Sequence, residues 1–180
     1  MDSKLQTIYK KEIVPALKKE FGFNNLMQVP KIEKVIINVG YGRHNKNKSY
    51  IENVENTLSR ITGQRPVHNL AKQSISNFKI REGMDIGMSV TLRGKSMYDF
   101  LYRFIHIALP RVRDFRGLNP KSFDKQGNYS IGIKENIAFP EVTAETLEKI
   151  HGLQVVIATT ANNKKEGMSL LRKMGLPIKK

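Results

Sequence analysis

The segment KIEKVIINV, residues 31–39, is rich in β-branched residues and alternates between core-type and surface-type positions. Because successive side chains of a strand point to opposite faces of its sheet, this period of two predicts a half-buried strand. One face would carry Lys34, Ile36 and Asn38. Asparagine is disfavoured in strands, so Asn38 either occupies a satisfied edge or bulge position or offers its amide to a ligand. The core-facing positions would be Val35, Ile37 and Val39.

Other short segments also predict strands. Residues 86–93 alternate in the same way, with Ser89, Thr91 and Arg93 on a polar face. The apolar face of that strand would carry Met88, Val90 and Leu92. Further strands are expected at residues 66–70, 129–133 and 153–159.

Helical spacing of apolar residues predicts helices between these strands. Ser3 would cap the first helix with Gln6 as its capping-box partner, and Pro15 would kink or divide it. Ser96 would cap a later helix that ends before Pro110. Other helices are expected around residues 51–61, 142–150 and 168–174, with stops at Thr62–Gly63 and at Gly175 with Pro177.

Strands and helices mix along the chain without a repeat or a low-complexity linker, so we expect one domain that spans residues 1–180. The pattern favours an α+β two-layer sandwich, in which a mainly antiparallel sheet packs helices on one face and leaves the other face open. An open face that carries Lys34, Asn38, Thr91 and Arg93 resembles the sheet surface that RNA-binding domains present to RNA. Long basic loops are expected at about residues 71–85 and 110–128. The first loop holds three cations around one aromatic residue, Phe78.

The charge of the chain points to a polyanionic partner. Its 180 residues include 31 Lys and Arg against 16 Asp and Glu, which gives a formal net charge of +15. Basic side chains near phosphates release counterions and strengthen association, so nucleic acid is the first candidate and a membrane surface the second. The chain has no Cys and no leader-like or long apolar segment, which predicts a soluble protein of a reducing, intracellular compartment.

Motifs for catalysis are missing or incomplete. Residues 40–43, GYGR, begin like a dinucleotide-binding loop, but Asn45 stands where the third glycine is needed, and no GxxxxGK[ST] or GxSxG motif occurs. The histidines are His44, His68, His106 and His151. Their spacing favours solvated or capping roles over a metal site. We therefore expect no catalytic residue, metal or cofactor, and the alternative is an RNA-modifying enzyme or nuclease with a basic surface.

Several longer motifs follow one another along the chain. They are VPKIEKVIINVG at residues 29–40, ITGQRPV at 61–67, FKIREGMDIG at 78–87, VTLRG at 90–94 and ALPRVRDFRGLNPKSFDKQGNYSIGIKE at 108–135. Together they resemble the bacterial large-subunit ribosomal protein five family over nearly the whole chain. The resemblance implies a non-enzymatic, cytoplasmic protein that binds 5S rRNA in the central protuberance. Further implied partners are 23S rRNA and the neighbouring proteins of that protuberance.

The resemblance also implies which side chains meet the RNA. The family recognises 5S rRNA through polar residues on the sheet face, and the matching residues here are Asn38, Gln64 and Thr91. The positions expected to contact phosphates are Lys31, Lys34 and Arg93. Phosphate contacts add affinity without reading the RNA sequence.

The two long loops have family counterparts as well. The loop after the second strand reaches toward peptidyl-site tRNA in the family, and the matching residues are Lys72, Ser74, Asn77, Lys79 and Arg81. A flexible basic loop suits a tRNA that must move on, because phosphate contacts hold it without fixing its register. The second loop resembles the region that bridges to the small subunit through its ribosomal protein thirteen. Its candidate residues are Arg111, Arg113, Arg116 and Lys121.

Overall fold

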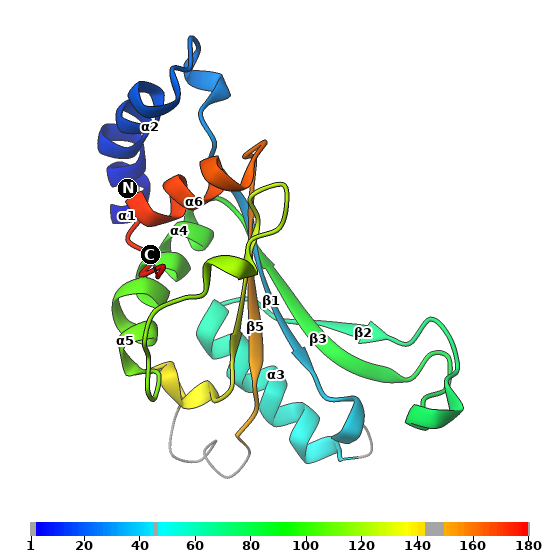
Figure 1. Ribbon diagram of the computed structural model, residues 1–180. Coiled ribbons are helices and arrows are strands. Elements are labelled where there is room, and N and C mark those ends of the chain that lie inside the picture. Colours follow the sequence, from blue (N-terminus) through cyan, green and yellow to red (C-terminus); the bar gives the residue numbers. More distant parts are fainter. Residues whose placement is uncertain (1–2, 45–46, 143–149, 180) are drawn as a thin grey trace.

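The computed structural model describes residues 3–44, 47–142 and 150–179. These residues form a five-stranded antiparallel sheet in the order β2-β3-β1-β5-β4, with helices beside it (Figure 1). The strands are β1 (Ile32–Gly40), β2 (Val67–Leu70), β3 (Asp85–Leu92), β4 (Tyr129–Ile133) and β5 (Leu153–Thr159). The helices are α1 (Lys4–Ile8), α2 (Val14–Phe21), α3 (Lys48–Thr62), α4 (Gly94–Arg103), α5 (Leu109–Arg111) and α6 (Lys164–Lys173). None of the helices in these ranges is long and apolar enough to cross a membrane.

The predicted α+β fold is confirmed, and each strand lies within a residue or two of its expected position. The alternation in the central strand β1 is confirmed as well, because Val35 and Ile37 are 0% exposed while Asn38 on the other face is half-buried. In β3, Leu92 is likewise 0% exposed and Thr91 is exposed. One face of the sheet is therefore apolar and covered, and the opposite face is polar.

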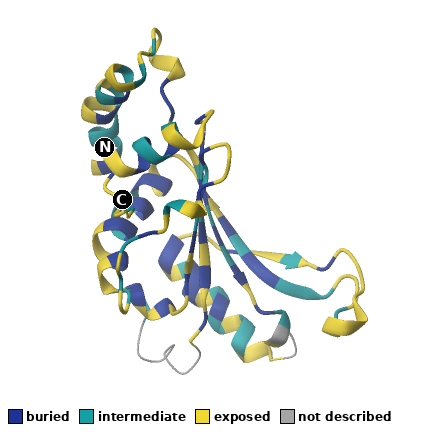
Figure 2. Ribbon diagram, in the orientation of Figure 1, coloured by how far each residue is buried: buried dark blue, intermediate teal, exposed yellow. Residues whose placement is uncertain are grey.

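The helices cover the apolar face. Leu58 of α3 and Phe100 of α4 are at most 1% exposed and share one apolar core with the strands. Figure 2 shows the buried residues concentrated where helices and sheet meet. α3 ends at Gly63, whose φ of 72° provides the left-handed conformation of a helix stop, as predicted.

Two prolines lie inside helices, and a π-helical turn precedes each of them. The turn Tyr9–Ile13 separates α1 from α2 ahead of Pro15, and the turn Phe104–Ala108 separates α4 from α5 ahead of Pro110. In a regular α-helix the proline ring clashes with the carbonyl one turn earlier, and the wider π turn changes that spacing. The predicted kink or division at Pro15 takes the form of the π-helical turn ahead of it, and the helix then continues through the proline to Phe21. The prediction that the later helix ends before Pro110 is wrong, because the helix continues to Arg111.

Both predicted helix caps are wrong in detail. Ser3 is the N-cap residue of α1, but its side chain makes no capping hydrogen bond, so no capping box forms with Gln6. α4 begins at Gly94 rather than after Ser96, because Gly94 with φ of 58° turns the chain directly after β3. The helix predicted at residues 142–150 lies outside the described residues except at its two ends.

The segment 110–128 is a surface loop only in part. Leu118 and Phe123 are both 7% exposed and belong to the core. Backbone hydrogen bonds also join the loop to the C-terminal segment, from Leu118 N to Pro177 O at 2.8 Å and from Lys179 N to Leu118 O at 3.0 Å. Two apolar anchors thus hold a loop that its Gly, Pro and Asn content predicts to be extended.

Candidate nucleic-acid interface

The sheet face opposite the helices presents neighbouring rows of side chains. The strand register places Asn38 of β1 between Ser89 of β3 and Gln154 of β5. The next row consists of Thr91, Ile36 and Val156. Polar groups thus flank a small apolar centre, a composition suited to nucleobases, which have polar edges and apolar faces.

Asn38 lies in the middle of the central strand. The irregular pairing of β1 with β5 lies between Ile32 and Lys34, whereas Asn38 is in regular register with strands on both sides. Neither an edge nor a bulge therefore explains this asparagine. Among the described residues, its half-buried side chain has no hydrogen-bond partner. Such an amide is available to a ligand, since polar groups at partly buried positions are normally satisfied.

The structure brings together four of the six residues expected to bind 5S rRNA. Lys34, Asn38, Thr91 and Arg93 belong to adjacent strands β1 and β3 or follow them directly, on the same face. Arg93 Nη1 lies 3.7 Å from Glu33 Oε1, and both side chains are about half exposed. An exposed ion pair of this kind contributes little, so Arg93 can exchange Glu33 for a phosphate.

The other two expected residues lie outside the centre of this face. Gln64 is exposed in the connection between α3 and β2. That connection is held by Arg65, whose Nε lies 3.1 Å from Glu55 Oε1, and by the hydroxyl of Thr62, which accepts from Gln64 N at 3.2 Å. Lys31 precedes β1, and its backbone amide donates to Thr160 Oγ1 at 3.0 Å. Neither residue belongs to a strand of the sheet.

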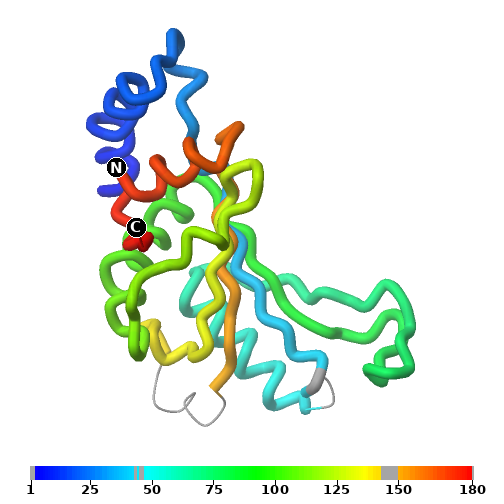
Figure 3. The backbone as a smooth tube through the Cα atoms, in the orientation of Figure 1, coloured from blue at the N-terminus to red at the C-terminus, as the bar shows by residue number. Residues whose placement is uncertain are grey.

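Residues 70–84 form an arm that continues the β2–β3 hairpin away from the body (Figures 1 and 3). At its base, Ala71 N donates to Met84 O at 2.8 Å and Gly83 N donates to Ala71 O at 2.9 Å. Nearer the tip, Ile75 and Ile80 exchange backbone hydrogen bonds of 2.9 and 3.2 Å. The expected long basic loop is therefore an arm braced by backbone hydrogen bonds.

All five residues expected to meet tRNA lie in this arm and are exposed. They do not all present free groups, because Ser74 Oγ accepts a hydrogen bond from Glu82 N at 2.9 Å. The hydroxyl of Ser74 thus helps to close the arm. Among the described residues, no carboxylate pairs with Lys72, Lys79 or Arg81.

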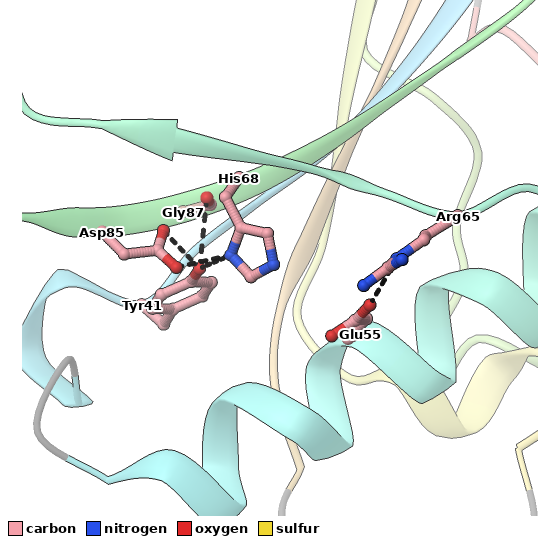
Figure 4. A network of polar contacts seen from close by, with 6 residues as sticks. All are labelled: Tyr41, Glu55, Arg65, His68, Asp85 and Gly87. Carbon is pink, nitrogen blue, oxygen red and sulfur yellow. Dashed lines mark hydrogen bonds and ion pairs between the residues drawn. The ribbon is translucent and has the colours of Figure 1, made fainter.

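A polar cluster fastens the arm to the body (Figure 4). We call it the Tyr41 cluster; it comprises Tyr41, His68, Asp85 and the carbonyl of Gly87. The Tyr41 hydroxyl donates to Asp85 Oδ1 at 2.6 Å and lies 3.2 Å from Gly87 O, and His68 Nδ1 lies 2.5 Å from Asp85 Oδ2. Burial, followed by the hydrogen bond to Asp85 and its charge, raises the pKa of Tyr41 above its usual range, so the hydroxyl remains a donor.

No sequence pattern predicts this cluster. Its members come from the residue after β1, from β2 and from β3, and only the folded register brings them together. Gly87 is also required by packing, because a Cβ there would lie 2.9 Å from Val39 O. The base of the arm is thus tightly packed, and this packing defines the direction in which the arm leaves the body.

The four residues expected at the intersubunit bridge are exposed but do not form one site. An open pocket of about 450 Å³ lies between the second loop and the edge strand β4, and its lining includes Arg113, Arg116 and Lys179. Arg111 ends α5 and Lys121 lies in the 3₁₀ turn Pro120–Ser122, and neither lines the pocket. The structure thus groups two of the four.

The histidines serve structural roles in the described part of the chain. His44 packs on Tyr50 and His106 on Tyr102, with ring centroids 4.7 and 4.6 Å apart. His151 is only 4% exposed, so the expectation of a solvated or capping role is wrong there: its ring fills a core position next to Asn136. In the described ranges, no three His, Asp or Glu side chains are grouped so that they could hold a metal ion.

Comparison with known proteins matches most of the chain. The model of the ribosomal L5P family C-terminus matches residues 85–178, and the model of ribosomal protein L5 matches residues 25–81. Among curated relatives, the large ribosomal subunit protein uL5 of Desulfotalea psychrophila is 53% identical over 178 residues, 99% of both chains. The uL5 proteins of Thermotoga maritima and Halothermothrix orenii are 52% and 51% identical, over 98% and 94% of this chain and 96% and 95% of theirs.

Proposed function

Since the chain belongs to the ribosomal protein L5 family of the large ribosomal subunit, we propose that its open sheet face binds 5S rRNA and helps to attach it in the central protuberance. Members of this family are structural proteins of the ribosome in the bacterial cytoplasm and not enzymes. The alternative of an RNA-modifying enzyme or nuclease with a basic surface is therefore set aside.

The observation that carries the proposal is the position of Asn38. This amide lies at the centre of the sheet between Ser89 and Gln154, on the face opposite the helices, and has no partner among the described residues. A base edge offers the donors and acceptors that such a row of amides and hydroxyls can match. Thr91 extends this row along β3, and Gln64 would add a contact from the connection between α3 and β2.

The cations around the sheet supply affinity rather than sequence reading. Lys31, Lys34 and Arg93 lie towards the end of the sheet where β1 begins and β3 ends, and they would contact phosphates of 5S rRNA. The net charge of +15 leaves basic surface for 23S rRNA as a second RNA partner. Attachment of 5S rRNA in the central protuberance would also place the chain next to the other proteins there.

The arm would contact tRNA in the peptidyl site. Its support is the projection of the arm from the body (Figure 3) and the exposure of Lys72, Lys79 and Arg81, which pair with no carboxylate in the part of the chain that the structure describes. Phosphate contacts by these cations are weakened by salt and do not fix the position of the tRNA. They suit a ligand that binds and leaves in every cycle of translation.

The second loop would contribute to a bridge with the small subunit through its ribosomal protein thirteen. Arg113 and Arg116, at the pocket beside β4, are the residues best placed to act together. Arg111 and Lys121 would make separate contacts from α5 and from the 3₁₀ turn.

The first test is binding of the purified chain to 5S rRNA and to an unrelated structured RNA of similar length across a salt series. We expect a 5S-selective complex that persists at moderate salt, because base-edge contacts are less salt-sensitive than phosphate contacts. Equal and steeply salt-dependent affinity for both RNAs would mean that the net charge alone drives binding, and the sheet-face proposal would fail.

A further inference from the structure

The tip of the arm exposes an aromatic ring. Phe78 is 70% exposed, and its neighbour across the turn, Ile75, is 44% exposed. Removal of a phenylalanine ring from water is favourable and lowers the free energy. A ring held at the end of a projecting arm, away from the core, is therefore placed for contact with a partner.

The backbone holds this ring in a defined position. Residues Ser76–Phe78 form a 3₁₀ turn closed by a hydrogen bond from Lys79 N to Ser76 O at 3.0 Å. Lys79 itself has φ of 55°, a left-handed conformation that costs a non-glycine residue free energy. The Ile75–Ile80 pair closes the turn from below. The tip is thus a locally strained turn with satisfied backbone groups and with Phe78 outside it.

The surroundings of the ring are cationic. Residues 71–84 contain Lys72, Lys79 and Arg81 against the single acid Glu82. None of the three cations is paired with a carboxylate among the described residues. A partner at the tip must therefore supply negative charge next to a flat apolar surface.

A nucleic acid base with its phosphates has this combination. Bases stack on aromatic side chains while neighbouring cations hold the backbone. A protein partner fits less well, because two exposed apolar side chains are far short of the roughly 800 Å² that each partner buries in a stable interface. We propose that Phe78 is a stacking platform for a nucleobase of the tRNA that the arm reaches, an inference that rests on the tRNA contact proposed above.

The first experiment uses tryptophan as a reporter. The natural chain has no tryptophan, so Phe78→Trp introduces a single indole at the tip. The matched control is Met27→Trp, because Met27 is 85% exposed in a turn remote from the arm (Figure 3). On titration of the full-length chain with deacylated tRNA, we expect the emission at position 78 to be quenched and that at position 27 to change little. Equal quenching at both positions would overturn the proposal.

The second experiment compares variants of the ring in ribosomes. Phe78→Leu keeps an apolar side chain but cannot stack, and Phe78→Tyr keeps the ring. In ribosomes reconstituted with each variant, we expect Phe78→Leu to weaken peptidyl-site tRNA binding about fivefold or more and Phe78→Tyr to retain it. Equal loss in both variants would show that keeping the ring does not keep tRNA binding, and it would overturn stacking.

A charge variant separates this inference from the tRNA contact on which it rests. If Lys79→Ala with Arg81→Ala weakens tRNA binding while Phe78→Leu does not, stacking is wrong and the tRNA contact stands. If neither variant weakens tRNA binding, both proposals are wrong.

Discussion

The sheet face and the arm are both basic, but they are supported differently. The sheet face lies on a core in which Val35, Ile37 and Leu92 are 0% exposed, so its polar side chains are fixed by the strands beneath them. The arm has almost no core of its own, because Ala71 is its only buried residue among residues 71–84 (Figure 2). Its shape depends on its own hydrogen bonds and on the Tyr41 cluster at its base.

This difference matches the two ligands that we propose. A permanent RNA partner favours a rigid face that presents base-reading groups at fixed spacing. A tRNA that passes through favours a locally braced arm, which can be displaced without unfolding the domain. Under the proposed function, one small basic protein divides permanent and transient RNA contacts between a core-supported and a self-supported surface.

The largest expected effect separates the two regions by stability. Leu92→Ala should lower the free energy of unfolding by about 2–5 kcal/mol, because it leaves a cavity in the core. Ile75→Ala, in the arm, should change it by less than about 0.5 kcal/mol. Urea unfolding measures both, and we expect a single transition because we propose that residues 1–180 fold as one domain. A loss with Ile75→Ala as large as that with Leu92→Ala would show that the arm is part of the core.

The next effect concerns recognition of 5S rRNA. Asn38→Ala should weaken binding by about 1–3 kcal/mol, and Gln64→Ala and Thr91→Ala should have effects in the same range, because each removes a contact to a base edge. Asn77→Ala is the matched control, since it removes the same amide from the arm. Filter binding or electrophoretic shift at fixed salt measures the affinities. Unchanged affinity in all three sheet variants would contradict the role of the sheet face.

A smaller effect is expected at the base of the arm. Tyr41→Phe removes the donor to Asp85. It should lower the free energy required for local opening of the arm by about 0.5–1.5 kcal/mol. Native-state hydrogen exchange at Ala71 N and Gly83 N reads this opening, with the amides of β1 and β5 as internal reference. Equal loss of protection in arm and strands would mean that Tyr41 stabilises the whole domain instead.

The raised pKa of Tyr41 adds a condition on pH. A phenol whose pKa is higher in the folded state stabilises that state below its unfolded pKa near 10, and the contribution is lost as the pH rises through the folded pKa. We therefore expect the stability difference between Tyr41→Phe and the natural chain to persist from neutral pH up to the unfolded pKa. A difference that disappears below pH 9 or so would contradict the burial of this hydroxyl.

The smallest effect lies in the salt dependence of tRNA binding. Lys79→Ala with Arg81→Ala should leave 5S rRNA binding unchanged and reduce the salt slope of tRNA binding by about 1.5–2. The control pair is Lys164→Ala with Lys165→Ala, two exposed lysines at the start of α6. An identical slope change in the control pair would show that position on the surface does not matter.

The sequence predicted local features well and long-range ones poorly. Alternation in residues 31–39 was enough to place Asn38 on the polar face, because strand period depends only on neighbouring residues. It could not show that β1 is the central strand, which decides that Asn38 is not at an edge. The Tyr41 cluster could not be predicted either, since it depends on the register of three segments.

Helix ends were a second source of error. The rule that proline ends a helix failed at Pro110 because the chain inserts a π turn before it, and such a turn leaves no simple sequence signal. In the candidate site, the residues of β1 and β3 could be predicted from the alternation of their strands together with the resemblance to the family. The exposure and strain at the tip of the arm required the structure.

The most direct test combines the two regions in one experiment. A sheet variant with Asn38→Ala, Gln64→Ala and Thr91→Ala and an arm variant with Lys72→Ala, Lys79→Ala and Arg81→Ala are each measured for 5S rRNA affinity and, in reconstituted ribosomes, for peptidyl-site tRNA retention. We predict that the sheet variant loses 5S rRNA affinity as the free chain and that the arm variant keeps it but loses tRNA in ribosomes. Loss of 5S rRNA affinity in both variants alike would contradict the division between the two surfaces.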